Sequence, residues 1–352
     1  MPNPTRREFL VETASCARHL ALAAAFTPAL ARAAWARRTV GPVVAAEPFG
    51  RLEAIGANVW ALISTPLGGD FTTVSNGGII AGKDGVLVYE GLTRPAGAKW
   101  LAERAKDLTG KWPTHALVSH YHGDHVNGIA GYGDGGPMPK LHLTANTRER
   151  SDKNQPADEA RSRALGSAIM LDPTSETKLD LGGRTVRVIP HAGHTASDVV
   201  VLLDDPPILF GGDLIWNGMF PNYMDCVPTL LAKTVRGLRG PAELLYVPGH
   251  GALGKQSDLD RYVSVLDEVE RAVRDAKSKG LTAAAGADHA RRVDAVQSQL
   301  HGDGVCGVVQ GAWRMTGKTG NTGRTPKTFR TWRRFRRART RKATGCLFPM
   351  AL

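Results

Sequence analysis

Residues 120–125 concentrate side chains that can bind metal ions. They read His-Tyr-His-Gly-Asp-His and follow the apolar run 116–119, which predicts a short buried strand. Four potential ligands in six residues are more than an ordinary surface loop needs. Imidazole nitrogens and carboxylate oxygens are ligands that zinc accepts. The segment therefore predicts a metal site at the end of a strand.

The geometry of an extended chain divides these ligands between two positions. Residues i and i+2 of an extended segment point the same way, so His120 and His122 can bind one ion side by side. Gly123 permits the chain to turn. The turn would bring Asp124 and His125 to a second position close by.

Three further motifs downstream each follow an apolar, strand-like run. They are Gly193-His194-Thr195, Gly211-Gly212-Asp213 and Pro248-Gly249-His250-Gly251. With residues 120–125, this order of motifs resembles the metallo-β-lactamase superfamily over roughly residues 50–280. The resemblance implies an α+β fold, an αββα sandwich of two mixed β-sheets with helices on the outer faces. It also implies that the ligands lie on loops at one edge of the sheets.

The resemblance further implies a role for each ligand. One zinc ion would be bound by three histidines, a second ion by Asp124 and two histidines, and one aspartate would bridge them: His120, His122 and His194; Asp124, His125 and His250; and Asp213. Two zinc ions per chain, roughly 3.5–4 Å apart, would lower the pKa of bound water from 15.7 to about 7. Asp124 would be the catalytic residue, since it can both bind a metal and orient the hydroxide.

The leading functional hypothesis is an exported zinc-dependent hydrolase, in which a metal-bound hydroxide attacks an ester, thioester, lactone or amide carbonyl. Fold and ligands are shared by enzymes that cleave different bonds, so they do not identify the substrate. The alternative on the same fold is a mononuclear iron sulfur-dioxygenase-type oxidoreductase, which uses a reduced ligand set. The complete set here argues against it. We expect a small-molecule substrate, no specific nucleic acid and no integral membrane association.

We do not expect the other histidines and cysteines near the motifs to bind metal. We expect His191 to lie behind the ligands or in solvent, and His115 to pack in the core. In the best-known lactamase subclass a cysteine occupies the place of Asp213, and Cys226 lies too far along the chain to replace it. This departure puts true β-lactamase activity in doubt. Residues 216–223 could line the substrate groove or form an ordinary loop.

Apolar runs bounded by turn residues predict the elements that must position these motifs. Strands are expected at 59–64, 78–81, 86–89, 178–181, 185–189, 199–203 and 208–211. Helical periodicity predicts helices at 96–108, 229–238, 257–277 and 282–300. Strands dominate each half of the chain, which indicates packed sheets with outer helices rather than a regular βαβ array.

The N-terminus is similar to an export signal of the twin-arginine type. Arg6 and Arg7 precede a mostly apolar, alanine-rich stretch at 20–30 and the small-residue site Ala31-Arg32-Ala33. This pattern predicts a periplasmic protein. An amphipathic first helix is the alternative. The domains expected are a signal peptide at 1–33, a linker at 34–49, a metallo-β-lactamase-like hydrolase domain at 50–302 and a basic tail at 303–352.

The positive charge of the chain belongs to this tail. The formal net charge is +12, but twelve basic residues follow residue 313, where no acid occurs, and the remaining charges balance. We expect the tail to be disordered or to result from a reading-frame error near residue 304. A third functional alternative is non-enzymatic binding of anionic surfaces through the tail, in which Phe329, Trp332 and Phe335 interleave with arginines.

Overall fold

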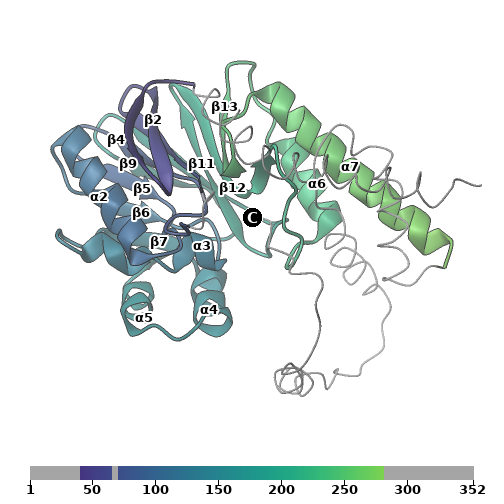
Figure 1. Ribbon diagram of the computed structural model, residues 1–352, viewed down its shortest axis with the longest axis horizontal. Helices are drawn as coiled ribbons and strands as arrows, with labels where there is room; N and C mark the ends of the chain where they lie inside the picture. Colours follow the sequence, from purple (N-terminus) through teal and green to yellow (C-terminus); the bar gives the residue numbers. More distant parts are fainter. Residues whose placement is uncertain (1–39, 66–69, 281–352) are drawn as a thin grey trace, which may run out of the picture. The chain divides into compact units, whose positions relative to one another are not determined.

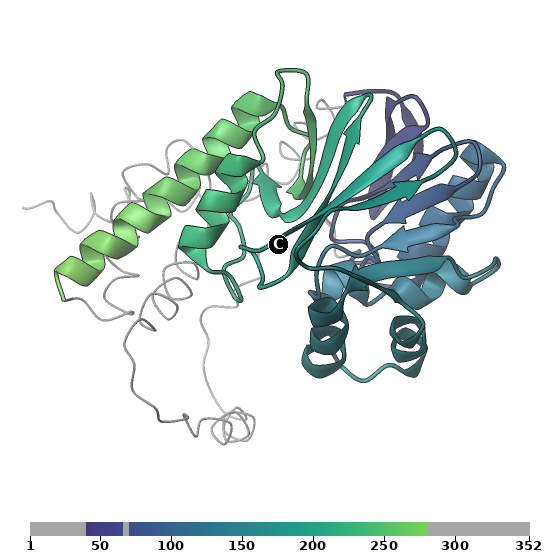
Figure 2. The same cartoon turned by 180° about the vertical axis from the view of Figure 1, so that it is seen from behind.

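Two β-sheets dominate the computed structural model, which describes residues 40–65 and 70–280. One sheet has eight strands and the other has five, and the two sheets face each other (Figures 1 and 2). Both lie in the first of two compact units, residues 1–268. The sandwich that the sequence predicted is therefore confirmed.

The larger sheet follows the order of the chain. Its strands are β1 (Val43–Glu47), β2 (Gly50–Gly56), β3 (Val59–Ser64), β4 (Gly77–Ala81), β5 (Val86–Tyr89), β6 (His115–Leu117), β7 (Lys140–Thr144) and β8 (Ile169–Leu171). Neighbours from β1 to β5 are antiparallel, and those from β5 to β8 are parallel. The carboxyl ends of β5, β6 and β7 therefore meet at one edge of the sheet.

The smaller sheet has the order β13-β12-β11-β10-β9. Its strands are β9 (Thr177–Asp180), β10 (Thr185–His191), β11 (Asp198–Asp204), β12 (Pro207–Asn217) and β13 (Leu245–Gly251). All its pairs are antiparallel except β12 with β13.

The helices are arranged around these sheets. They are α2 (Pro95–Thr109), α3 (Gly123–Val126), the 3-10 helix η1 (Ile129–Gly133), α4 (Ala145–Asn154), α5 (Glu159–Gly166), α6 (Pro228–Gly237) and α7 (Gln256–Ser278). Helix α2 covers the outer face of the larger sheet, and α6 packs beside β12 in the other half of the sandwich (Figure 1). Helix α7 continues into the second unit, residues 269–352, whose described part ends at residue 280.

Strand β3 shows why an unbroken apolar run forms a strand here. All six of its residues are buried. Val59, Ala61 and Ile63 belong to the core between the sheets, whereas Trp60 and Leu62 belong to the core beneath α2. A strand alternates its side chains between two faces, so a strand covered on both sides must be apolar at every position. Each large aliphatic side chain buried in this way contributes about 1.5–3 kcal/mol.

Most elements agree with the sequence-based predictions within a few residues, but two differences matter. Residues 43–47, expected in a linker, form β1, an edge strand paired with β2. Its first four residues are apolar, but their side chains are exposed or only partly buried, so pairing with β2 rather than burial makes it a strand. Strand β12 was expected to end at Gly211 but continues to Asn217 through an irregular register. The predicted helix 282–300, the signal peptide and the basic tail lie outside the described residues.

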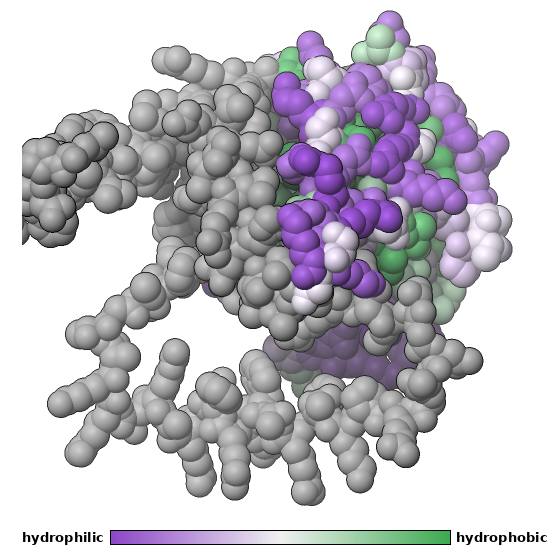
Figure 3. Space-filling view, turned by 90° about the vertical axis from the view of Figure 1, so that its right-hand side faces the viewer, coloured by the Kyte–Doolittle hydropathy of each residue, from purple (hydrophilic) through white to green (hydrophobic). Residues whose placement is uncertain are grey.

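Additional short elements were not predicted. Strands β2, β7 and β8 and helices α4 and α5 have mixed composition, and their stability comes from contacts with neighbouring elements. The coloured part of the surface in Figure 3 is mainly hydrophilic, with hydrophobic residues in small areas. Among the residues that the structure describes, no helix has the length and apolar character needed to cross a membrane.

Candidate metal centre

The carboxyl ends of neighbouring strands carry the predicted ligands to one edge of the sandwich. Strand β6 leads into the segment that contains His120 and His122, and the one-turn helix α3 carries Asp124 and His125. The loop between β10 and β11 carries His194. The remaining two predicted ligands, Asp213 and His250, lie on β12 and β13.

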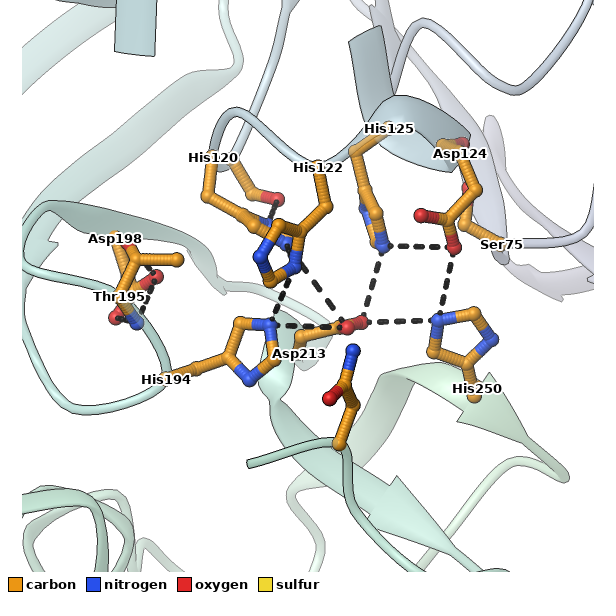
Figure 4. A network of polar contacts seen from close by, with 12 residues as sticks. Ser75, His120, His122, Asp124, His125, His194, Thr195, Asp198, Asp213 and His250 are labelled. Atoms are coloured by element: carbon orange, nitrogen blue, oxygen red, sulfur yellow. Dashed lines mark hydrogen bonds and ion pairs between the residues drawn. The ribbon is translucent and has the colours of Figure 1, made fainter. Parts of the chain in front are cut away.

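Four side chains form a first cluster, composed of His120, His122, His194 and Asp213. His122 Nδ1 lies 3.1 Å from His120 Nε2 and 2.9 Å from His194 Nε2. Asp213 Oδ2 lies 3.3 Å from His194 Nε2 and 3.9 Å from His120 Nε2. Figure 4 shows these side chains converging on one point. The expectation that His120 and His122 act side by side agrees with this geometry.

Three side chains form a second cluster, composed of Asp124, His125 and His250. Asp124 Oδ2 lies 3.1 Å from His250 Nε2 and 3.5 Å from His125 Nε2. Asp213 also reaches this cluster, since its Oδ1 lies 3.1 Å from His125 Nε2 and 3.2 Å from His250 Nε2. The two oxygens of Asp213 thus face different clusters (Figure 4).

Glycines make this placement of Asp213 possible. Gly212 adopts a φ of +50°, and a Cβ there would lie 2.9 Å from Ser119 Oγ. The pairing of β12 with β13 is irregular on both sides of Gly212. A Cβ on Gly249 would overlap Asp213 Oδ1. Only glycine at these positions allows the carboxylate to lie between the two clusters.

The site fits a pair of metal ions. Asp213 Oδ1 and His125 Nε2 are buried and lie 3.1 Å apart, but neither makes a well-aligned hydrogen bond with any described residue. Buried polar atoms in folded proteins are nearly always paired, so such atoms need a ligand. Five imidazoles and two carboxylates, without a thiolate, form a donor set that suits zinc. The chain therefore has two His/Asp clusters suited to metal binding.

The two clusters differ in their electrostatics. Burial lowers the pKa of His120 well below its usual value and that of His194 to about 3, so both imidazoles are neutral. Burial would also lower the pKa of His250, but Asp213 and Asp124 raise it to about 9. Burial alone would raise the pKa of Asp124, whereas His125 and His250 lower it to about 2. Carboxylates thus make the second cluster the more favourable place for positive charge.

Two acidic residues at the site were missed by sequence analysis. Glu90 follows β5 and is fully buried. Its Oε2 accepts a hydrogen bond from Ser119 N at 3.1 Å, and its Oε1 lies 3.1 Å from His125 Nδ1. Asp225 Oδ2 lies 2.9 Å from His122 Nε2. The signal for Glu90 was an acid directly after an apolar strand, whereas nothing in the sequence links residues 122 and 225.

Residues at the end of β12 and in the loop after it mostly support the candidate ligands. Trp216 stacks on His250, with ring centroids 4.1 Å apart. Asn217 donates to the carbonyls of Ala252 and Leu253. Tyr223 is also buried. These contacts favour a packing role over a groove lining.

The other weighed residues lie outside both clusters. His191 is partly buried on β10, and burial lowers its pKa. His115 pairs with His142 at 2.9 Å. Cys226 is buried, and its burial raises the pKa of the thiol. Neither cluster of the described residues includes any of them.

Known proteins are similar to this chain in sequence and in fold. The chain is 27% identical to a metallo-beta-lactamase type 2 of Bacillus sp. (strain 170), over 61% of this chain and 81% of the relative. It is 28% identical to a metallo-beta-lactamase type 2 of Bacillus cereus, over 66% of this chain and 89% of the relative.

Solved structures show the same fold. A metallo-beta-lactamase from Pontibacter korlensis matches with a TM-score of 0.53 and 22% identity, covering 62% of this chain and 99% of that one. One from Hirschia baltica matches with a TM-score of 0.51 and 20% identity, covering 62% and 97%. The model of the metallo-beta-lactamase superfamily matches residues 71–267, which include all seven candidate ligands. The chain therefore belongs to the metallo-beta-lactamase superfamily and is a metal-dependent hydrolase.

Proposed function

We propose that the protein is a zinc hydrolase in which each cluster holds one ion and Asp213 bridges them. His120, His122 and His194 would bind the first ion, and Asp124, His125 and His250 the second. The observation that carries this proposal is the carboxylate of Asp213, whose two oxygens face different clusters. An enzyme with a single iron would not need both clusters, so the complete set favours the hydrolase over the dioxygenase alternative.

The reaction follows from the chemistry of these groups. Bound zinc would lower the pKa of water and polarise a carbonyl oxygen. Asp124 combines a cluster-facing Oδ2 with a side chain that is a quarter exposed, so it can orient a water molecule arriving from solvent. Its carboxylate can then accept a proton as the carbonyl is attacked. We propose an ester, thioester, lactone or amide as the bond that is cleaved.

Two measurements test this proposal together. Metal analysis of the purified protein should give about two zinc ions per chain. One redox-active iron per chain would contradict the zinc hydrolase. The zinc-loaded protein is then assayed against nitrocefin, thioesters, lactones and aryl phosphates. The two Bacillus relatives are named as beta-lactamases, so nitrocefin is one arm of the panel. Absence of hydrolysis in every carbonyl arm would contradict the proposed bond class.

The proposal includes export to the periplasm and the expected order of domains, with an earlier start for the hydrolase domain. The paired arginines Arg6 and Arg7 and the apolar stretch behind them support export. The pairing of β1 with β2 supports a hydrolase domain that already begins within the expected linker. Fractionation of cells that produce the full chain tests export.

A further inference from the structure

A buried polar segment lies behind the second cluster. Residues 73–76 (Thr-Val-Ser-Asn) precede β4, and Thr73, Ser75 and Asn76 are each at most 1% exposed. Ser64 Oγ, at the end of β3, donates to the carbonyl of Ser75 and lies 2.8 Å from Thr73 Oγ1. Thr73 Oγ1 donates in turn to Phe49 O at 2.8 Å. These bonds fix the segment to the larger sheet.

The backbone of this segment has an unusual form. Ser75 N donates to Thr73 O at 2.8 Å, which closes a three-residue γ-turn around Val74. Val74 has a φ of +63°, although β-branched residues rarely adopt the left-handed region. Such a conformation persists only where surrounding contacts determine it. The turn directs Ser75 and Asn76 toward two ligand-bearing segments.

Ser75 contacts the segment that carries Asp124. Its Oγ donates to the backbone carbonyl of Asp124 at 2.6 Å, and Figure 4 shows the two residues side by side. The partners are 49 residues apart in the chain. The hydroxyl of Ser75 therefore fixes the first turn of α3 against the larger sheet.

Asn76 hydrogen-bonds to backbone carbonyls before and after His250. Its Nδ2 donates to Pro248 O at 2.9 Å and to Gly251 O at 2.8 Å, and its backbone N donates to Gly249 O at 2.7 Å. Its Oδ1 accepts a hydrogen bond from Ser64 N at 2.9 Å. Both amide donors and the amide oxygen are thus used, and the carbonyls on both sides of His250 are held.

We propose that Ser75 and Asn76 are positioning residues for the second metal ion. Ser75 fixes the backbone of Asp124, and Asn76 fixes the backbone of His250, so together they set the separation of two ligands of one ion. Partners that orient metal ligands change metal affinity by about 10–100-fold. The inference rests on the proposed two-zinc function and adds to it a selective support for one of the two positions.

The first cluster has separate supports. Within the described residues, no hydrogen bond joins residues 73–76 to His120, His122 or His194. The turn after His194 is held by Asp198, which accepts hydrogen bonds from Thr195 N and Thr195 Oγ1. Ser75 and Asn76 thus form a clamp on the segments of Asp124 and His250, and loss of this clamp should weaken zinc binding at the second position and spare the first.

The test measures zinc binding rather than activity. Apo-protein of the full chain is titrated with zinc against a chelator, for the wild type and for Ser75→Ala and Asn76→Asp. Asn76→Asp keeps the oxygen that faces Ser64 but removes both amide donors. The step missing in His250→Ala identifies the second position. We expect that step to weaken about 10–100-fold in both variants and the other step to change less than about threefold.

Ser151→Ala is the matched control. Ser151, on α4, is fully buried, and its Oγ donates to Thr147 O at 2.6 Å; among the described residues it makes no hydrogen bond to residues 120–125, 193–195, 213 or 248–251. Its two zinc affinities should equal those of the wild type. If both zinc-binding steps weakened equally, or if Ser75→Ala left both zinc affinities unchanged, the positioning role of Ser75 and Asn76 would be wrong but the two-zinc function would stand. A wild type that binds only one zinc ion would overturn the two-ion function and the clamp with it.

Discussion

Asp124 is the residue at which metal binding and chemistry can be separated. We expect Asp124→Asn to retain the fold and most of the metal, because the amide keeps an oxygen at the site. Turnover should fall about 10²–10⁴-fold, since the proton acceptor is lost. Steady-state kinetics and zinc content per chain measure the two effects. Asp107→Asn, which alters an exposed partner of Arg104, is the control; unchanged turnover in a loaded Asp124→Asn variant would contradict the proposed role.

Asp225 makes a separate residue-level prediction for the first position. Its carboxylate accepts from His122 Nε2, and the hydrogen bond from His122 lowers its pKa. This contact leaves His122 Nδ1 facing the cluster. Asp225→Ala should weaken zinc binding at the first position about 10–100-fold in chelator competition. Asp204→Ala, an exposed partner of Arg187, should have no effect. Equal affinities in both variants would show that Asp225 does not orient the ligand.

The side chain of Arg184 links elements of the two sheets. It lies between β9 and β10 and donates to Ala57 O at 2.7 Å, Ala81 O at 3.0 Å and Asp205 O at 3.2 Å. Two of these carbonyls belong to the larger sheet or its turns. Arg184→Ala should reduce the free energy of unfolding by about 1–3 kcal/mol, because charged hydrogen bonds to these carbonyls are lost.

Urea denaturation measures the effect of Arg184→Ala. Arg163→Ala removes an exposed pair with Glu159 at 3.7 Å and should change stability by no more than about 0.5 kcal/mol. If the two variants unfold at the same urea concentration, Arg184 does not join the sheets.

A histidine pair on β6 and β7 predicts the pH dependence of stability. His115 Nδ1 lies 2.9 Å from His142 Nε2, and the rings stack. Burial, then His115 and Lys140, lowers the pKa of His142 from 6.5 to about 4. Between these pH values the unfolded chain binds a proton that the folded chain does not. Stability should therefore fall as pH drops from 6.5 to 4, by up to about 1.4 kcal/mol per pH unit from this group.

The comparison of wild type with His142→Gln in the same metal state isolates this contribution. Other titrating groups are common to both proteins, so the difference reports His142 together with its contact to His115. Chemical denaturation at several pH values should give a shallower slope for His142→Gln between pH 4 and 6.5. Parallel slopes would mean that the pKa of His142 is the same in the folded and the unfolded protein.

Strand β12 shows how much of an element can be predicted. The run 208–211 predicted a strand, and Gly211-Gly212 indicated its end. The structure instead uses Gly212 for a close approach to Ser119, and pairing with β13 resumes at Trp216. Composition marks the glycine but not whether it ends a strand or forms a bulge, because the neighbouring segment decides that. Short strands such as β8 depend on neighbours in the same way.

Export is a prediction for the whole molecule. Arg6→Lys together with Arg7→Lys should leave precursor in the cytoplasm, because a twin-arginine signal depends on both arginines. Cell fractionation followed by mass measurement of the exported chain would detect the change. A general secretory signal tolerates lysines, so unimpaired export would point away from the twin-arginine interpretation. Zinc binding by the purified chain should be the same in both proteins.

The amino-acid sequence by itself determined the types of the candidate ligands, their order and the apolar strands that lead to them. These features depend on side-chain chemistry and on the local period of a strand, which are readable within a few residues. Only the tertiary structure decided that one oxygen of Asp213 faces each cluster, and that Glu90, Ser75, Asn76 and Asp225 contact the ligands or the segments that carry them. Such contacts join residues far apart in the chain, so they arise only when the two sheets pack and bring their strand ends together.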